Sequence, residues 1–337
     1  MAADRYSYLS CMGWAVLVGA GVAVLAGTRV QRRVVRGVCV GVIVVLGGLT
    51  WRQTLVWQDT ESLWRRALRM APDCWLAHNN LGLYLMQRGE VGTARKHFER
   101  TLALNPDSLG GHTNLASALM SLGEWRGAER HYRKVVSFRP ERGKEHPNLG
   151  AAHWGLANAL VQQGKMHEAI EHYSRGLEVQ PGSAEAHCNL ANALVKTARS
   201  GEAIAHYAEA IRLRPDMAEA HCNLANVLSG QGKTDEAVGH YQEALRIKDD
   251  YPEAHNNLGT ALGRRGKIVE AVEHFSAAVR LRPAYAEAHN NLGSALAIQG
   301  RLNEAIEHFS EAVRLKPTFA RAQENLAKAR AEQAAKP

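Results

Sequence analysis

The sequence predicts an all-α protein, a solenoid of stacked helix hairpins that follows a two-helix transmembrane hairpin. Three observations predict it. The first 51 residues hold two long stretches that are almost free of charge. From Trp75 onward, apolar residues return with a period of 34 residues and follow helical spacing within each period. The composition, with 46% hydrophobic and 22% charged residues, is that of a globular protein and excludes a disordered chain.

Residues 1–57 are expected to cross a membrane twice. Residues 8–27 carry no charge, and a helix of that length spans about 30 Å, the thickness of the hydrocarbon core. Residues 34–51 form the second stretch, whose one charge, Arg36, lies near its start. The basic loop between the stretches is expected in the cytoplasm, because positive charge marks that side. A cleaved signal peptide is the alternative, but it would need no second apolar stretch.

This pattern predicts the localisation of the chain. We expect an integral membrane protein of the bacterial inner membrane or an equivalent one. Because both ends of a two-span hairpin face the same side, the repeats are expected on the non-cytoplasmic side.

Residues 75–319 indicate seven repeats of a helix hairpin. Two leucines four residues apart mark the first helix, and an alanine followed four residues later by an aromatic residue marks the second. In the last repeat, Gly300 marks the turn and Pro317 ends the second helix. One hairpin cannot bury its own apolar face, so neighbouring repeats are expected to stack and share a core. The expected units, called repeats 1 to 7 below, are 75–108, 109–142, 150–183, 184–217, 218–251, 252–285 and 286–319.

Flanking segments and two departures complete the expected domain plan. Residues 58–74 resemble an isolated second helix, and residues 320–337 resemble a polar, alanine-rich capping helix. Ala198 replaces the turn glycine of repeat 4, and residues 143–149 are an insertion between repeats 2 and 3.

The residues that could carry chemistry are better explained by packing. Fourteen of the 16 histidines recur at two fixed positions of the repeat, whereas a metal site needs a local cluster of ligands. The net charge of +8 forms no basic tract, so no nucleic-acid partner is expected. Cys188 and Cys222 are expected to be reduced thiols. We therefore expect no catalytic residue, no metal site and no cofactor in this chain.

Asparagine recurs at fixed positions of the expected first helices. Helix propensity does not explain this recurrence, because asparagine is a poor helix former. It precedes the first leucine in six repeats, with Gly155 as the exception in repeat 3, and repeats 3 to 5 carry an asparagine three residues after this position. The first position is rotated by about 200° from the recurring histidine, so the amide points away from the partner helix. Amides can donate to and accept from the main chain of an extended peptide. The candidate peptide-binding residues are Asn80, Asn114, Asn158, Asn189, Asn192, Asn223, Asn226, Asn257 and Asn291.

The period and the leucine, alanine, aromatic and proline positions resemble the tetratricopeptide repeat (TPR). This resemblance implies a right-handed superhelix whose first helices line a concave face, with the asparagines on that face. The alternative is that asparagine is simply common at this position in TPR sequences. The runs Ala-His-Cys-Asn-Leu-Ala-Asn at 186–192 and 220–226 are similar to the TPR arm of O-linked N-acetylglucosamine transferase.

The N-terminal segment resembles the transmembrane-and-TPR family of membrane O-mannosyltransferases. The resemblance rests on Ala3-Asp4-Arg5-Tyr6, the two spans and the repeats that follow. In that family, a multi-span catalytic half uses a polyprenyl-phosphate sugar donor, and the TPR arm is extracytoplasmic. Only the C-terminal half is matched, so this chain alone is expected not to transfer sugar. A lipid-linked sugar is expected only where the catalytic half is present.

Together these patterns predict a membrane-tethered scaffold that binds extended segments of protein partners on an asparagine-lined concave face. The alternative is the acceptor-docking part of a membrane glycosyltransferase, with the catalytic half outside this chain. A soluble cytoplasmic adaptor is a third interpretation, but it conflicts with the two apolar stretches.

Overall fold

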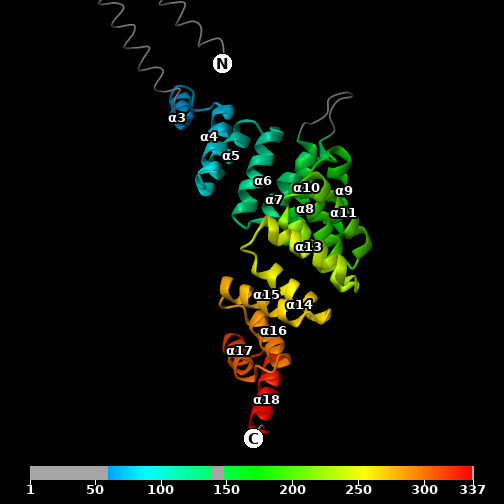
Figure 1. The fold of residues 1–337 in the computed structure, drawn as a ribbon. Helices are drawn as coiled ribbons and strands as arrows, with labels where there is room; N and C mark the ends of the chain where they lie inside the picture. Colours follow the sequence, from blue (N-terminus) through cyan, green and yellow to red (C-terminus); the bar gives the residue numbers. More distant parts are fainter. Residues whose placement is uncertain (1–59, 139–147, 336–337) are drawn as a thin grey trace, which may run out of the picture. The chain divides into compact units, whose positions relative to one another are not determined.

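The computed structural model describes residues 60–138 and 148–335, which form α-helices joined by short turns (Figure 1). Within these ranges no β-strand occurs, and the predicted all-α class is confirmed. The two expected membrane spans lie outside the described residues. Among the helices that are described, none combines the length and the apolar character needed to cross a membrane.

The chain divides into two compact units, one up to His131 and one from Tyr132 onward, so the division falls within helix α7 (Trp125–Ser137). The helices before α7 are α3 (Thr60–Met70), α4 (Trp75–Gln87), α5 (Val91–Leu104) and α6 (Leu109–Ser121). The helices after α7 are α8 (Leu149–Gln162), α9 (Met166–Val179), α10 (Ala184–Lys196), α11 (Ser200–Leu213), α12 (Ala218–Gly230), α13 (Thr234–Ile247), α14 (Pro252–Arg264), α15 (Ile268–Leu281), α16 (Ala286–Ile298), α17 (Leu302–Leu315) and α18 (Ala320–Ala335).

Within each unit the helices pack in chain order. From α8 to α18, each even-numbered helix contacts the odd-numbered helix of its own repeat, and that helix contacts the next even-numbered one. The same order links α3, α4, α5 and α6 in the first unit. Figure 1 shows this alternation along the second unit. The even-numbered helices from α4 to α16 are called first helices below, and their partners second helices.

The core of each repeat is built from the four positions that carry the sequence period. In repeat 6, Leu258 and Leu262 on the first helix are 0% and 2% exposed, and Ala271 and Phe275 on the second helix are 0% and 5% exposed. The equivalent leucines, alanines and aromatic residues are buried in the other repeats as well. The apolar stripe on each helix therefore faces its partner, as helical spacing predicts.

The turn between the two helices of a repeat requires a left-handed residue. Glycine fills this place with φ between 75° and 79° in six repeats, for example at Gly232 and Gly266. In repeat 4 the residue is Ala198, with φ of 59°. Glycine takes this conformation without steric cost because it has no Cβ, whereas alanine does not.

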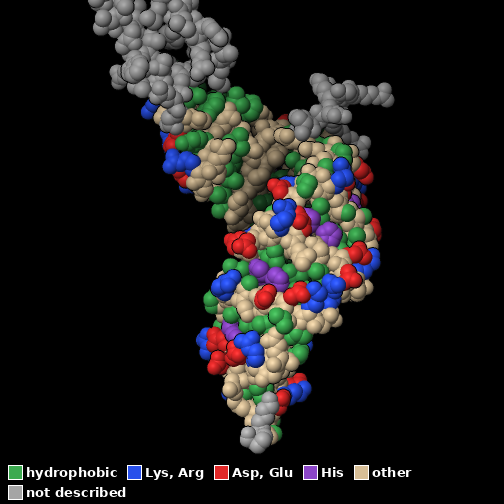
Figure 2. Space-filling model, viewed as in Figure 1, with side chains coloured by type: hydrophobic (Ala, Val, Ile, Leu, Met, Phe, Trp, Pro, Cys, Tyr) green, Lys and Arg blue, Asp and Glu red, His purple; other side chains and the backbone are tan. Residues whose placement is uncertain are grey.

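Charged side chains of both signs are mixed on the face that Figure 2 shows. Among the described residues, ion pairs recur at the start of second helices, such as Arg199 with Glu202 and Arg301 with Glu304, each at 2.6 Å. Positive and negative charge therefore neutralise each other at these helix starts.

Candidate functional site

The predicted asparagines all lie on first helices, and none of them is fully buried. In the first unit, Asn80 lies on α4 and Asn114 on α6. In the second unit, the others follow one another on α8, α10, α12, α14 and α16. Asn226 is exposed and the rest are half-buried, so these amides meet solvent. Peptide binding by these residues stays a prediction.

In the second unit, the asparagines bond from one repeat to the next. Nδ2 of Asn223 donates to Oδ1 of Asn192 in the preceding repeat, with an N–O distance of 3.1 Å. Asn257 donates in the same way to Asn226 at 2.9 Å. These bonds tie neighbouring first helices together and occupy one N–H of each donor.

Other repeats use a different acceptor, the residue directly before the first asparagine of the preceding repeat. This acceptor is again an asparagine, and it lies where the middle repeats have Trp154, Cys188 or Cys222. The bonds are Asn291 to Asn256, Asn325 to Asn290 and, in the first unit, Asn114 to Asn79, with N–O distances of 2.9, 2.9 and 2.8 Å.

The acceptor in each case is the asparagine that the preceding repeat provides, and its position goes together with the aromatic residue of the second helix in repeats 3 to 7. In repeats 3 to 5 this residue is tyrosine, and its hydroxyl donates to the asparagine that lies three residues after the position of the first asparagine. Burial raises the pKa of these phenols, so each hydroxyl stays protonated and can donate. The bonds are Tyr173 to Asn158, Tyr207 to Asn192 at 2.5 Å and Tyr241 to Asn226 at 2.7 Å.

In repeats 6 and 7 the aromatic residue is phenylalanine and packs against a glycine of the first helix. A methyl group at Gly259 would lie 2.8 Å from the Phe275 ring, and one at Gly293 would lie 2.9 Å from Phe309. The ring therefore lies close to the helix backbone and has no hydroxyl to hold a second asparagine. In these repeats the acceptor amide precedes the first asparagine instead.

Sequence reasoning missed the acceptors Asn79, Asn256 and Asn290, and it missed Asn325 in the cap. A signal for each was present. The first three form Asn-Asn doublets after a histidine, and Asn325 follows Asn291 by one full period. The row of amides thus continues into α18.

The recurring histidines pair within every repeat, one from each helix. Their Nδ1 atoms lie 2.8 to 3.1 Å apart in all seven repeats. The pairs are His78–His97, His112–His131, His153–His172, His187–His206, His221–His240, His255–His274 and His289–His308.

The hydrogen-bond partners fix the protons of these pairs. Nε2 of His187 lies 3.2 Å from the carbonyl oxygen of Pro181, which only accepts, so Nε2 carries the proton. Nδ1 of His187 is then an acceptor, and Nδ1–H of His206 donates to it. Burial lowers the pKa of His206, as it lowers that of His153 to about 4. The pairs link the two helices of a repeat, and the bond from Nε2 of His187 to the Pro181 carbonyl oxygen links successive repeats.

Other reactive groups offer no catalytic arrangement among the described residues. No group of three His, Cys, Asp or Glu side chains there could hold a metal ion. Cys188 and Cys222 are unpaired and buried, and burial raises their pKa to about 12 and about 11. Thiols with such pKa values are poor nucleophiles at neutral pH.

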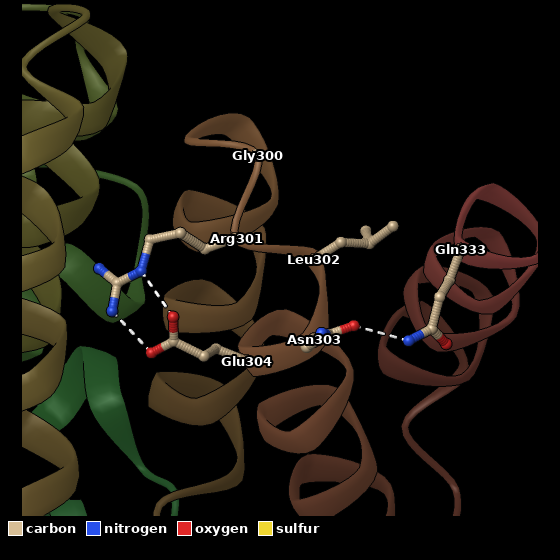
Figure 3. A pocket seen from close by; sticks show the side chains of 6 residues that line it. All are labelled: Gly300, Arg301, Leu302, Asn303, Glu304 and Gln333. Atoms are coloured by element: carbon tan, nitrogen blue, oxygen red, sulfur yellow. Dashed lines mark hydrogen bonds and ion pairs between the residues drawn. The ribbon is translucent and has the colours of Figure 1, made fainter. Parts of the chain in front are cut away.

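A shallow polar cavity of about 370 Å³ lies between the start of α17 and the cap α18 (Figure 3). Its polar side chains already have partners. Arg301 pairs with Glu304 at 2.6 Å, and Nε2 of Gln333 donates to Oδ1 of Asn303 at 2.6 Å. It therefore offers little unsatisfied polarity to a ligand.

Comparisons with known proteins agree on the repeat class. Residues 108–334 match the family described as the cilia and flagella-associated protein 70 C-terminal domain, and residues 57–109 match the tetratricopeptide repeat. None of the curated proteins matches the chain in sequence. The resemblances to the two glycosyltransferase families stay predictions.

Several solved structures resemble the chain at low sequence identity, and the first of those named here shows the same fold. The Cut9–Hcn1 hetero-tetramer of APC/C is 16% identical, with a TM-score of 0.58, over 80% of this chain and 52% of that one. YrrB, described as a TPR protein with an unusual peptide-binding site, is 23% identical over 52% of this chain and 90% of its own, with a TM-score of 0.46. MamA is 21% identical over 49% and 96%, also with a TM-score of 0.46.

Proposed function

Because the chain belongs to the TPR family described as the cilia and flagella-associated protein 70 C-terminal domain, we propose that it is a scaffold that binds protein partners on its repeats. The partner segment is extended, and it lies along the first helices. TPR solenoids present an extended surface of this kind, and stacked repeats suit a ligand that runs across several of them.

The observation that carries the proposal is the row of amides on the first helices. Asn189, Asn223 and Asn257 follow one another on α10, α12 and α14, and all three are half-buried. Each keeps hydrogen-bonding capacity, because an amide offers two N–H donors and an oxygen with two lone pairs. The bonds between repeats use one N–H of Asn223 and one of Asn257. The remaining groups suit a peptide main chain.

We further propose that the scaffold is tethered to a membrane by residues 1–57, with the repeats on the non-cytoplasmic side. The support is the pair of apolar stretches with a basic loop between them. Resistance of the native protein to alkaline carbonate extraction is the expected result, together with protease access to the repeats from the non-cytoplasmic side. Release of the protein by carbonate would contradict the tether.

A second candidate function is acceptor docking for a membrane glycosyltransferase. The observation that favours it is the motif Ala3-Asp4-Arg5-Tyr6 before the first apolar stretch. The intact mass of the native protein distinguishes the two functions. A mass near 36.9 kDa favours the tethered scaffold, and a product longer by a catalytic half favours acceptor docking.

The triple substitution Asn189→Ala, Asn223→Ala and Asn257→Ala tests the binding face. Peptides are first selected on the full chain from a displayed library of about 12 residues, which span about 40 Å when extended. The variant is expected to bind the selected peptide at least tenfold more weakly by fluorescence polarisation, because several main-chain bonds are lost. Its melting temperature should change little, since the lost bonds of about 1 kcal/mol each are offset by the better helix propensity of alanine.

The control is Gln242→Ala with Ser276→Ala, two exposed polar residues on second helices. This control should bind like the unmodified chain. Unaltered affinity of the asparagine variant, or failure to select any peptide, would contradict the proposed face.

A further inference from the structure

Repeats 3 to 5 and repeats 6 and 7 hold their amides in different ways. Repeats 3 to 5 are called tyrosine repeats here, because in each of them a buried tyrosine donates to an asparagine of the first helix. These tyrosines are Tyr173, Tyr207 and Tyr241. Repeats 6 and 7 have Phe275 and Phe309 at the same position and are called phenylalanine repeats. The difference reaches the proposed binding face, because each tyrosine hydroxyl bonds to an asparagine on that face.

In repeat 4 the tyrosine fixes which end of the amide meets solvent. Oδ1 of Asn192 accepts from the Tyr207 hydroxyl at 2.5 Å and from Asn223 at 3.1 Å. Two donors use both lone pairs of an amide oxygen. The Nδ2 group of Asn192 has no partner among the described residues, so its two N–H donors remain for a ligand.

Repeat 5 repeats this arrangement one period later. Oδ1 of Asn226 accepts from the Tyr241 hydroxyl at 2.7 Å and from Asn257 at 2.9 Å, and Asn226 is exposed. The first asparagine of this repeat, Asn223, has given one N–H to Asn192, and its oxygen accepts from no described side chain. Each of these repeats therefore presents a donor and, three residues earlier on the same helix, an acceptor.

The phenylalanine repeats lack this pair. Their extra amides, Asn256 and Asn290, are 6% and 1% exposed. The residues at the position of Asn192 are Thr260 and Ser294, whose hydroxyls donate to the carbonyl oxygen four residues earlier at 2.9 Å. These side chains satisfy their own helix and leave less for a ligand.

We infer that Tyr207 and Tyr241 are positioning residues that orient Asn192 and Asn226 to read the main chain of a bound segment at repeats 4 and 5. This inference rests on the proposed function and narrows it to part of the row. In an extended strand, every second residue directs both its N–H and its C=O to the same side. Along that side, one such residue lies about 7 Å from the next. A donor and an acceptor about 5–6 Å apart on one helix face match that alternation without reading side chains.

Two sets of variants test the inference with the peptide selected on the full chain. The double substitution Asn192→Asp and Asn226→Asp keeps the Oδ1 atoms that accept from the tyrosine hydroxyls. It replaces each Nδ2 group, which is the free donor, by an oxygen atom. Tyr207→Phe with Tyr241→Phe removes only the two hydroxyls. Each pair of substitutions is expected to weaken peptide binding about tenfold, because about one to two hydrogen bonds are lost or misoriented.

The matched control is Tyr285→Phe, which removes a hydroxyl that bonds to no amide within the described ranges. It should bind like the unmodified chain. A second measurement compares the affinities of the selected peptide and of the same peptide methylated at its main-chain nitrogens. A purely structural role of the tyrosines would leave the ratio of these affinities unchanged. N-methylation should weaken binding to the unmodified chain strongly, and it should matter less for the Tyr207→Phe, Tyr241→Phe variant.

The outcomes separate the two proposals. If both variants bind like the unmodified chain while the asparagine-to-alanine variant does not, the inference is overturned and the proposed face stands. If no peptide is selected on the full chain, both fail. Loss of affinity in both the aspartate and the phenylalanine variants at an unchanged melting temperature supports the inference. Loss in the aspartate variant alone overturns the positioning role of the tyrosines.

Discussion

At residue scale, the turn of repeat 4 contains a non-glycine residue in the left-handed backbone conformation, which is sterically unfavourable for a residue with a Cβ. Ala198 has φ of 59°, where the other repeats have glycine. An L-residue in this conformation places Cβ too close to the following carbonyl, at a cost of about 1–2 kcal/mol. The cost is tolerated because the stacked helices on both sides fix the turn.

Replacing this residue by glycine should therefore stabilise the protein. Ala198→Gly is expected to add about 1 kcal/mol to the free energy of unfolding, reduced somewhat by the greater freedom of glycine in the unfolded chain. The reverse change in the next repeat, Gly232→Ala, is the matched control and should destabilise, since Gly232 has φ of 79°. Urea titration followed by circular dichroism measures both. Equal stability of the two variants would contradict the argument.

At the scale of elements, the histidine pairs make the contact between helices depend on pH. Burial holds the pKa of His153 at about 4 and lowers that of His206, relative to the usual 6.5. A base whose folded pKa is lowered contributes stability above pH 6.5. As the pH falls below 6.5, the unfolded chain takes up protons that the folded chain does not. Stability is therefore lost between about pH 6.5 and about pH 4.

The expected result is a melting temperature that falls steeply through this window, because burial lowers the pKa of at least one paired histidine in six repeats. His206→Gln should flatten the dependence, since glutamine still donates to His187 but does not titrate. Glu202 and Glu209 on the same helix remain in this variant, so only the histidine changes. His167→Gln, at an exposed residue outside the pairs, is the control and should leave the slope unaltered. A melting temperature that is constant from pH 7 to pH 4 would refute the argument.

At the scale of the whole molecule, stability should be local to neighbouring repeats. The helices of repeat 6 pack against those of repeats 5 and 7. Leu258, which is fully buried on α14, supports that stack. In a solenoid, the loss of one such side chain is felt by adjacent repeats rather than by distant ones.

Leu258→Ala is therefore expected to cost about 2–5 kcal/mol and to act unevenly along the chain. Amide hydrogen exchange should accelerate in helices α12 to α17 and remain unchanged in α4 and α5. Ala284→Ser, at an exposed residue of a loop, serves as the control. Uniform acceleration along the whole chain would show a single cooperative unit instead.

The repeating core was predictable because its signals are local. Leu258, Leu262, Ala271 and Phe275 lie at helical spacing within one hairpin, and each is buried as that spacing requires. Only the fold class is confirmed by this agreement. The expected membrane spans fall in residues 1–57, outside the part of the chain that the structure describes.

The bonding of the amides could not be predicted from the period. Asn223 reaches back 31 residues to Asn192, whereas Asn291 reaches back 35 residues to Asn256. Neither separation equals the 34-residue period, so aligning equivalent positions does not bring the partners together. In repeat 4 the acceptor is Asn192, because Cys188 stands where repeat 6 has Asn256. The bond from the Tyr207 hydroxyl to Asn192 is visible only in the three-dimensional packing.

The two ways of pairing amides affect how an array of repeats can gain or lose repeats during evolution. A first asparagine finds an acceptor in the preceding repeat whether that repeat contains tyrosine, as for Asn257, or phenylalanine, as for Asn291. Loss of repeat 5 by unequal exchange within the gene would place Asn192 before Asn257, and the same bond could form. Gly155 has no amide at this position, and Tyr132 of the preceding repeat lies too close to it for a larger residue. Repeats 5 to 7 thus carry a first asparagine that can bond to either kind of preceding repeat, whereas the repeat that contains Gly155 requires a preceding repeat whose aromatic ring fills the space beside it.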